Sequence, residues 1–157
     1  PSIYVYENNR YSEHTHSSYV IASESIASRV EGFGIHTVKA NGFDFFEVHE
    51  VMKELIAKAR EGNGPCAVEF ETTRFYGHFE GDPQNYRAPT ELEDDRENND
   101  CLKIFRSKVS EAGLLADEDL DNIDNEVLAL IDDAVEQAQN SPAPTPDDVT
   151  TDVYVSY

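Results

Sequence analysis

Short apolar segments alternate with helical patterns along the first half of the chain. Residues 2–6 predict a strand buried on both faces, and residues 35–39 and 66–72 predict two further strands. Helical patterns lie between them: a short one around residues 23–32, which ends at two glycines, and a longer one that begins at Asp44. Strands separated by helices of this length are typical of an α/β fold with a parallel sheet.

The helix that begins at Asp44 has the most complete local pattern. Glu47 follows three residues later, so the pair matches a capping box, and Gly62 marks the end of the helix. One face of the helix is apolar at helical spacing, and it consists of Phe45, Val48, Met52, Leu55, Ile56 and Ala59. We therefore expect this face to pack against the sheet.

The second half of the chain is patterned differently. Residues 99–112 and 117–139 predict two amphipathic helices joined by a short link, which together make a helical hairpin. Residues 141–146 contain three prolines and predict a stiff, extended connector. The last residues, 153–157, are apolar enough to dock as a strand or clasp. We expect residues 91–157 to form an acidic region of their own, consisting of this hairpin and an extended tail.

The net charge of −20 is concentrated in that second region. Residues 1–90 carry 13 acidic and 8 basic side chains, whereas residues 91–157 carry 19 and 4. Such a field repels phosphates and anionic lipids, so nucleic acids and membrane surfaces are poor partners. Solvated helix faces or a basic protein partner both explain the charge, and we interpret the acidic run at residues 93–95 as a solvated linker.

The remaining composition indicates a cytoplasmic globular protein. Hydrophobic residues make up 39% of the chain, and no apolar run approaches the roughly 20 residues of a membrane helix. Cys66 and Cys101 lack metal-type spacing and predict reduced thiols rather than a disulfide. The chain starts at Pro1 and enters a strand pattern at once, so we expect the fold to begin earlier in a parent chain. A half-sheet with an open edge also predicts a homo-oligomer, most simply a dimer.

Two polar segments follow predicted strands, where ligands of parallel sheets bind. The first, Glu7-Asn8-Asn9-Arg10-Tyr11, is by itself most simply a turn, although an amide oxygen and backbone carbonyls also suit magnesium. The second spans residues 73–87 and combines cations, glycines and His78, a composition suited to holding a phosphate and moving a proton. His14 and His16 lack a third ligand, so an exposed polar loop is the better interpretation of that pair.

Both segments resemble motifs of the alpha subunits of thiamine-diphosphate-dependent 2-oxo acid and acetoin dehydrogenases. PSIYVYENNRY is similar to the close of the family's thiamine diphosphate motif, whose opening Gly-Asp-Gly is absent from this chain. The pattern Arg-x-x-Gly-His…Asp-Pro…Tyr-Arg within residues 74–87 is similar to the family's active-site loop. The Gly-His-Phe-Glu-Gly-Asp variant, residues 41–49 and the ending at residues 152–157 look most like the acetoin branch.

The resemblance implies a role for each matching residue. Asn9 through its side chain and Tyr11 through its backbone carbonyl are expected to bind magnesium and thiamine diphosphate. His78 is expected to be the catalytic residue that approaches the cofactor. The residues expected to order the loop are Arg74, Asp82, Tyr86 and Arg87. Phe79 stands where kinase-regulated relatives have a serine, so phosphorylation at that position is excluded.

By this resemblance, residues 1–90 are the carboxy-terminal part of a thiamine diphosphate-binding α/β domain. The family cleaves acetoin or 2-oxo acids, with a beta subunit completing the cofactor site and a lipoyl acyltransferase receiving the acyl group. Without the Gly-Asp-Gly half, the isolated chain is expected to be inactive. The alternative is a truncated, non-catalytic homologue that self-associates or acts as an interaction module. The family assignment requires Asn9 and His78 to meet at neighbouring strand ends.

Overall fold

The computed structural model describes residues 1–153, which divide into two compact units. The first unit is Pro1–Ala112, and the second begins at Gly113. The division expected near residue 90 therefore falls inside the first unit. Two contacts explain this: an ion pair joins Arg10 to Asp95, and the ring of Phe105 packs 5.2 Å from that of Phe45.

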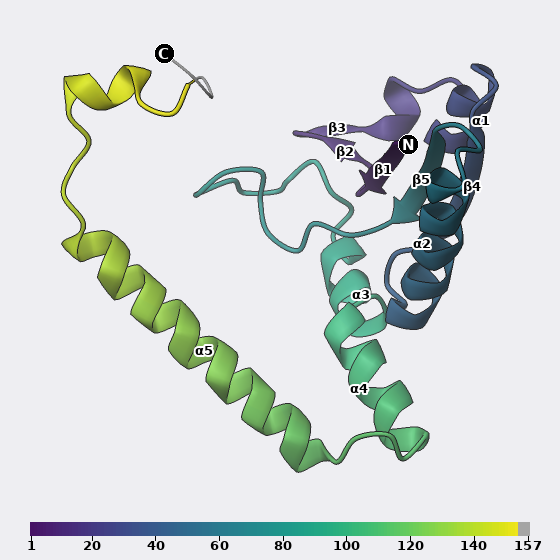
Figure 1. The fold of residues 1–157 in the computed structure, drawn as a ribbon. Coiled ribbons are helices and arrows are strands. Elements are labelled where there is room, and N and C mark those ends of the chain that lie inside the picture. Colours follow the sequence, from purple (N-terminus) through teal and green to yellow (C-terminus); the bar gives the residue numbers. More distant parts are fainter. Residues whose placement is uncertain (154–157) are drawn as a thin grey trace. The chain divides into compact units, whose positions relative to one another are not determined.

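The first unit is built on a three-stranded parallel sheet, as the alternating pattern predicted (Figure 1). The strands are β1 (Ile3–Asn8), β4 (His36–Asn41) and β5 (Cys66–Glu71), and β5 lies between the other two. Every residue of β5 except Glu71 is buried, as expected for a central strand. The register aligns Asn8, Asn41 and Glu71, so all three strands end at one edge.

β1 corrects one prediction, because it is not buried on both faces. Tyr4 and Val5 remain 49% and 47% exposed. Within the described residues β1 is an edge strand that pairs with β5 alone, so its outer edge and part of its faces stay open. The apolar run correctly predicted a strand, but the prediction that both faces of the strand are buried was wrong.

Two helices cover opposite faces of the sheet. α2 (Phe45–Arg60) packs its apolar face against β4 and β5, with Leu55, Val68 and Phe70 in the core between them. α1 (Ile26–Glu31) lies on the other face, because the backbone N–H of Ala27 donates to Glu69, whose side chain points away from Val68 and Phe70.

The start of α2 confirms the predicted cap but not the predicted capping box. The Asp44 carboxylate accepts the N–H of Phe46 (3.1 Å), as an N-cap residue should. The Glu47 carboxylate instead accepts the N–H of Asn41 (2.9 Å), at the end of β4. Glu47 therefore links the end of β4 to the start of α2. Its carboxylate accepts a hydrogen bond from the strand end, and not from the helix N-cap residue as the local motif predicted.

Two helices complete the first unit after a long loop at residues 72–90. α3 (Glu91–Asn98) was not predicted, and α4 (Cys101–Glu111) matches the predicted helix at residues 99–112. α4 packs through Phe105 against Phe45 and Phe46 at the start of α2, where Lys108 also donates to Asp44. Both thiols, buried Cys66 and exposed Cys101, are free.

The second unit contains the other helix expected for the hairpin, α5 (Asp117–Asn140), followed by the short helix η2 (Pro146–Thr150). Large apolar side chains on α5 are exposed, among them Ile123, Val127, Leu130 and Ile131. None of the helices within residues 1–153 combines the length and the apolarity needed to cross a bilayer. Of the predicted apolar tail, residues 154–157 lie outside the described part of the chain.

Candidate functional site

The two segments with predicted site residues begin at the same edge of the sheet. β1 and β5 are parallel neighbours, with Asn8 opposite Glu71, so the turn after β1 and the loop after β5 leave the sheet side by side (Figure 1). The turn leads into a small hairpin of β2 (Tyr11–Ser12) and β3 (Thr15–His16). The hairpin and the loop at residues 73–87 then contact each other repeatedly.

The turn after β1 is fixed by its two asparagines. The side-chain oxygen of Asn8 accepts the N–H of Arg10, and that of Asn9 accepts the N–H of Tyr11, both at 2.9 Å. Arg10 has a φ of 69°, which such turns favour. An amide oxygen has two lone pairs, so Asn9 keeps one for a second partner. The turn interpretation of this segment and the ligand interpretation are therefore compatible.

A buried carboxylate supports the turn from below. Glu69 is 1% exposed, and its two oxygens accept the side-chain amide of Asn8 and the backbone N–H of Ala27, both at 2.7 Å. The amino-terminal end of α1, the last residue of β1 and the centre of β5 are thereby joined. The orientation of Asn8, and with it the start of the turn, depends on this side chain.

Asp82 organises the loop after β5. One of its carboxylate oxygens accepts the N–H of His78 (2.8 Å) and the hydroxyl of Tyr86 (2.7 Å), and the other accepts the N–H of Gln84 (2.9 Å). Burial raises the pKa of Asp82, but the hydrogen bonds from Gln84, His78 and Tyr86 outweigh burial and lower the pKa to about 2. Asp82 is therefore ionised at neutral pH and holds the loop closed on itself.

Arg74 joins that loop to the hairpin. Its guanidinium donates to the carbonyl of Glu13 (2.9 Å) and to the hydroxyl oxygen of Tyr86 (2.7 Å). It also lies 3.4 Å from Nδ1 of His78. Since a guanidinium can only donate, Nδ1 is the acceptor, and the proton of the neutral imidazole is on Nε2. The contact with Arg74 therefore leaves Nε2 as the nitrogen of His78 that can donate a hydrogen bond.

Arg87 and Tyr11 form a second junction between the two segments. The Arg87 guanidinium lies 4.7 Å above the Tyr11 ring, donates to the carbonyl of Arg74 (2.8 Å) and pairs with Glu91 (3.1 Å). The Tyr11 hydroxyl donates to the same Glu91 carboxylate (2.8 Å). Burial and this hydrogen bond raise the pKa of Tyr11, so the phenol stays protonated.

The acidic run at residues 93–95 is not a solvated linker. It lies within α3, and Asp95 is 5% exposed. The Asp95 carboxylate accepts two contacts from the Arg10 guanidinium (2.9 and 3.2 Å) and one from Asn99 (2.7 Å). The local charge pattern gave no sign of this, because the partner that buries Asp95 lies 85 positions earlier.

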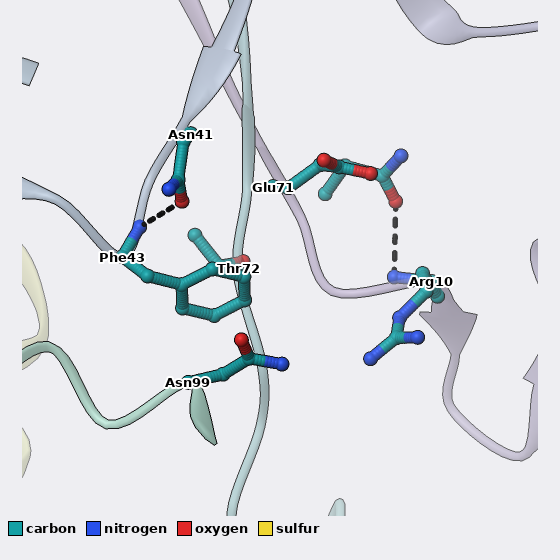
Figure 2. A pocket seen from close by; sticks show the side chains of 7 residues that line it. Arg10, Asn41, Phe43, Glu71, Thr72 and Asn99 are labelled. Atoms are coloured by element: carbon teal, nitrogen blue, oxygen red, sulfur yellow. Dashed lines mark hydrogen bonds between the residues drawn. The ribbon is translucent and has the colours of Figure 1, made fainter. Parts of the chain in front are cut away.

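A polar pocket of about 370 Å³ opens at the carboxyl edge of the sheet (Figure 2). Its lining comes from all three strand ends and from the segment before α4. The lining residues are Asn8, Arg10, Asn41, Phe43, Glu71, Thr72 and Asn99. Asn9, Tyr11 and His78 are not among them, so the pocket lies beside the cluster of predicted residues rather than within it.

The structure brings most predicted residues into one cluster. His78, Arg74, Asp82 and Tyr86 contact one another directly, and Tyr11 reaches Tyr86 with a ring separation of 5.5 Å. Asn9 belongs to the cluster through its hydrogen bond to Tyr11. Glu69 and Glu91 are functional candidates that the sequence pattern did not single out, and His14 and Asp95 are candidates that it interpreted as exposed. Each of them takes its role from a partner distant in sequence.

The donor set suits magnesium in part. Asn9 offers a side-chain oxygen, and the Tyr11 carbonyl is a second hard oxygen in the same turn. Within residues 1–153, no three His, Cys, Asp or Glu side chains are grouped so that they could hold a metal ion. Four buried polar atoms of the described loop, including Nε of Arg74 and Nε of Arg87, also have no hydrogen-bond partner. The site therefore offers some, but not all, of the groups that a complete cofactor site needs.

Comparison with known proteins gives consistent matches along the chain. The family described as dehydrogenase E1 component matches residues 1–147. The acetoin:2,6-dichlorophenolindophenol oxidoreductase alpha subunit of Cupriavidus necator is 54% identical over 157 residues, covering 100% of this chain and 47% of the relative. The protein of the same name in Bacillus subtilis is 38% identical over 160 residues, covering 100% and 46%.

A pyruvate dehydrogenase E1 component alpha subunit, from Rhizobium meliloti, is 31% identical over 153 residues, covering 98% of this chain and 44% of the relative. The chain thus spans about half the length of the curated relatives that it matches.

Proposed function

Because the chain belongs to the dehydrogenase E1 component family, we propose that it is the carboxy-terminal portion of an alpha subunit whose enzyme cleaves acetoin or a 2-oxo acid with thiamine diphosphate. The observation that carries this proposal is the meeting of the β1 turn with the loop at residues 73–87, through Arg74, Tyr86 and Arg87. The names of the relatives at 54% and 38% identity favour acetoin.

In this proposal the turn after β1 binds the cofactor's metal. The side-chain oxygen of Asn9 and the carbonyl of Tyr11 bind magnesium, and a carboxylate from the part of the relatives' length that this chain does not span completes the ligands. Thiamine diphosphate, when bound, supplies the chemistry that breaks the bond next to the substrate carbonyl. The protein's contribution is to position the reacting groups and to exclude water.

His78 is the proposed catalytic residue of this chain. Arg74 directs its proton to Nε2, and Asp82 holds its backbone through the 2.8 Å hydrogen bond. With Nδ1 facing Arg74, the Nε2–H group of His78 can donate a hydrogen bond to an oxygen of the bound substrate. Arg87 and Tyr86 keep the loop against the hairpin, so that His78 stays beside the segment that follows β1.

We propose two partners for the enzyme, a beta subunit and a lipoyl acyltransferase that accepts the acyl group on lipoamide. Support for the first is that the relatives are themselves named as alpha subunits. Exposed apolar side chains on α5, such as Leu130 and Ile131, are also suited to contacts with another subunit. The free thiols of Cys66 and Cys101 support a cytoplasmic location.

The isolated 157 residues are proposed to be inactive. Calorimetry with thiamine diphosphate and magnesium on this chain alone should show little or no binding, because the carboxylate ligand is missing. Tight, magnesium-dependent binding would contradict this.

In the full-length alpha subunit assembled with its beta subunit, acetoin should drive reduction of 2,6-dichlorophenolindophenol. His78→Ala should lower that rate by about 10²-fold or more, whereas His49→Ala, on the exposed face of α2, should leave it unchanged.

A second candidate function is a self-associating, non-catalytic module, and the open edge of β1 favours it. Tyr4 and Val5 are half-exposed there, and a second copy could cover them by extending the sheet. Sedimentation velocity of the 157-residue chain at micromolar concentration tests this directly. A dimer that Val5→Lys dissociates supports self-association through β1, and a monomer counts against it.

A further inference from the structure

His14 lies in the turn of the hairpin and is partly exposed, as its sequence context predicted, but it also contacts the loop at residues 73–87. Its imidazole stacks on the ring of Tyr86, with centroids 4.9 Å apart and planes 29° from parallel. It also lies 5.9 Å from the ring of Phe79 and meets His78 edge-on at 6.3 Å. One side chain of the hairpin therefore contacts three ring side chains of the loop, although it stays partly exposed.

The same imidazole covers the carboxylate that organises the loop. Nε2 of His14 is 3.7 Å from the Asp82 oxygen that binds both His78 and Tyr86. The Asp82 side chain is 1% exposed, whereas that of His14 is 48% exposed. His14 thus shields from water one side of the hydrogen bond between Tyr86 and Asp82.

We propose that His14 is a positioning residue: by stacking on Tyr86 it holds the Tyr86–Asp82 hydrogen bond in place and thereby fixes the orientation of His78. The significance of a fixed His78 rests on the proposed function, but the contacts do not depend on it. Stacked aromatic rings prefer offset geometries such as this one. Without the stacked imidazole, the Tyr86 hydroxyl would be free to exchange its hydrogen bond with Asp82 for one with water.

The neighbours of His14 indicate whether it positions His78 through stacking or through its charge. The charged group that faces it from the loop is Asp82, and the second imidazole, His78, which Arg74 contacts, lies beside it. The 3.7 Å separation from Asp82 exceeds a hydrogen bond. The contact that remains whatever the charge of His14 is the stack on Tyr86, so an uncharged aromatic ring should replace the imidazole.

Nuclear magnetic resonance of the full 157-residue chain, without cofactor, tests the proposal. In His14→Ala, the amide and imidazole signals of His78 should move from their wild-type positions. The pKa of Asp82, followed through its carboxyl carbon, should rise from about 2 towards the ordinary value of 3.8. In His14→Phe, the His78 signals should return to their wild-type positions, and the Asp82 pKa should return most of the way, because the charge of His14 is the smallest of the causes that lower it. His49→Ala, an exposed histidine of α2, should change neither.

Two results overturn the proposal. One is a folded His14→Ala chain whose His78 signals and Asp82 titration match the wild type. The other is a His14→Phe chain that departs as far as His14→Ala does. If His14→Ala does not fold, His14→Gln replaces it, and the same comparison with His14→Phe decides. Because no cofactor is present, failure here leaves the proposed enzymatic function untouched, and absence of cofactor binding leaves this inference untouched.

Discussion

Gly77 lies so close to Asp82 that a side chain at position 77 has no room. A Cβ atom built on Gly77 would be 2.5 Å from Cβ of Asp82 and 3.0 Å from its carboxylate. The glycine before His78 is therefore required by the close approach of two parts of the same loop. That approach is what allows the N–H of His78 to reach Asp82 at 2.8 Å.

Gly77→Ala should open the loop. The added methyl group forces Gly77 and Asp82 apart, which breaks the His78–Asp82 hydrogen bond at a cost of about 1–3 kcal/mol in the free energy of unfolding. Urea denaturation measures the cost, and the amide signal of His78 reports the broken bond. Gly32→Ala is the matched control, since its Cβ meets only the Arg29 carbonyl, at 3.2 Å. Equal effects of the two variants would contradict the prediction.

The stability that Asp82 provides should depend on pH in the acid range. Its folded pKa of about 2 lies below the ordinary value of 3.8, so folding favours the ionised form. This contribution is complete above the unfolded pKa and is lost as the pH falls through the folded pKa. The difference in unfolding free energy between wild type and Asp82→Asn should therefore be largest above pH 3.8 and shrink towards pH 2.

Comparing the wild type with Asp82→Asn separates the contribution of Asp82 to stability from the contributions of other carboxylates. The pKa of Asp44 is also lowered, by its hydrogen bond with Lys108, so the wild type alone loses stability in acid for several reasons. Glu80→Gln, an exposed change in the same loop, is the control and should leave the pH profile of the wild type intact. An Asp82 carboxyl carbon that titrates near 3.8 would show that the hydrogen bonds of the loop are weak in solution.

The cluster around Asp82 was predictable only in part. The resemblance pointed to Arg74, His78 and Asp82, because their spacing along a single loop is visible in the sequence. His14 was considered only as a metal ligand and Glu91 was missed, because both act on side chains far away: Glu91 bonds Tyr11 across 80 positions. Composition and periodicity describe neighbours along the chain, so they cannot identify such partners. A parallel arrangement of β1 and β5 was needed to bring the segments together.

The fold, too, was predictable only in part. Strand and helix periods predicted the parallel sheet, α2 and α5, since each buries or exposes a regular stripe. α3 was missed because its sequence, Glu91–Asn98, is almost entirely polar and has no apolar period. It packs through the ion pair of Asp95 with Arg10 instead of an apolar face. The exposure of β1 was missed because position within the sheet is decided by pairing, not by the strand's own residues.

Removing Asp95 should weaken the attachment of α3 to the turn after β1. Asp95→Ala leaves Arg10 and Asn99 without their acceptor, at a cost of about 1–3 kcal/mol in the free energy of unfolding. Because Arg10 is partly exposed and can turn to water, the lower half of that range is expected. Glu97→Ala, an exposed acidic change in the same helix, should have little effect. Limited proteolysis should also cut near α3 sooner in Asp95→Ala than in the control.

Glu69 provides the strictest test of how the turn is held. Its two oxygens each accept one donor, from Asn8 and from Ala27. Glu69→Gln has the same shape but places an amide NH₂ against one of those donors, so a buried polar group loses its partner. We expect a loss of about 1–3 kcal/mol in the free energy of unfolding, together with displaced amide signals from Arg10 and Tyr11, whose N–H groups bond to Asn8 and Asn9.

The control is Glu71→Gln, two residues later on β5, where the side chain is exposed and pairs only weakly with Lys39 at 3.5 Å. If Glu69→Gln leaves the turn signals in place while lowering stability, the carboxylate supports α1 alone, and the orientation of Asn8 and Asn9 must come from the turn itself.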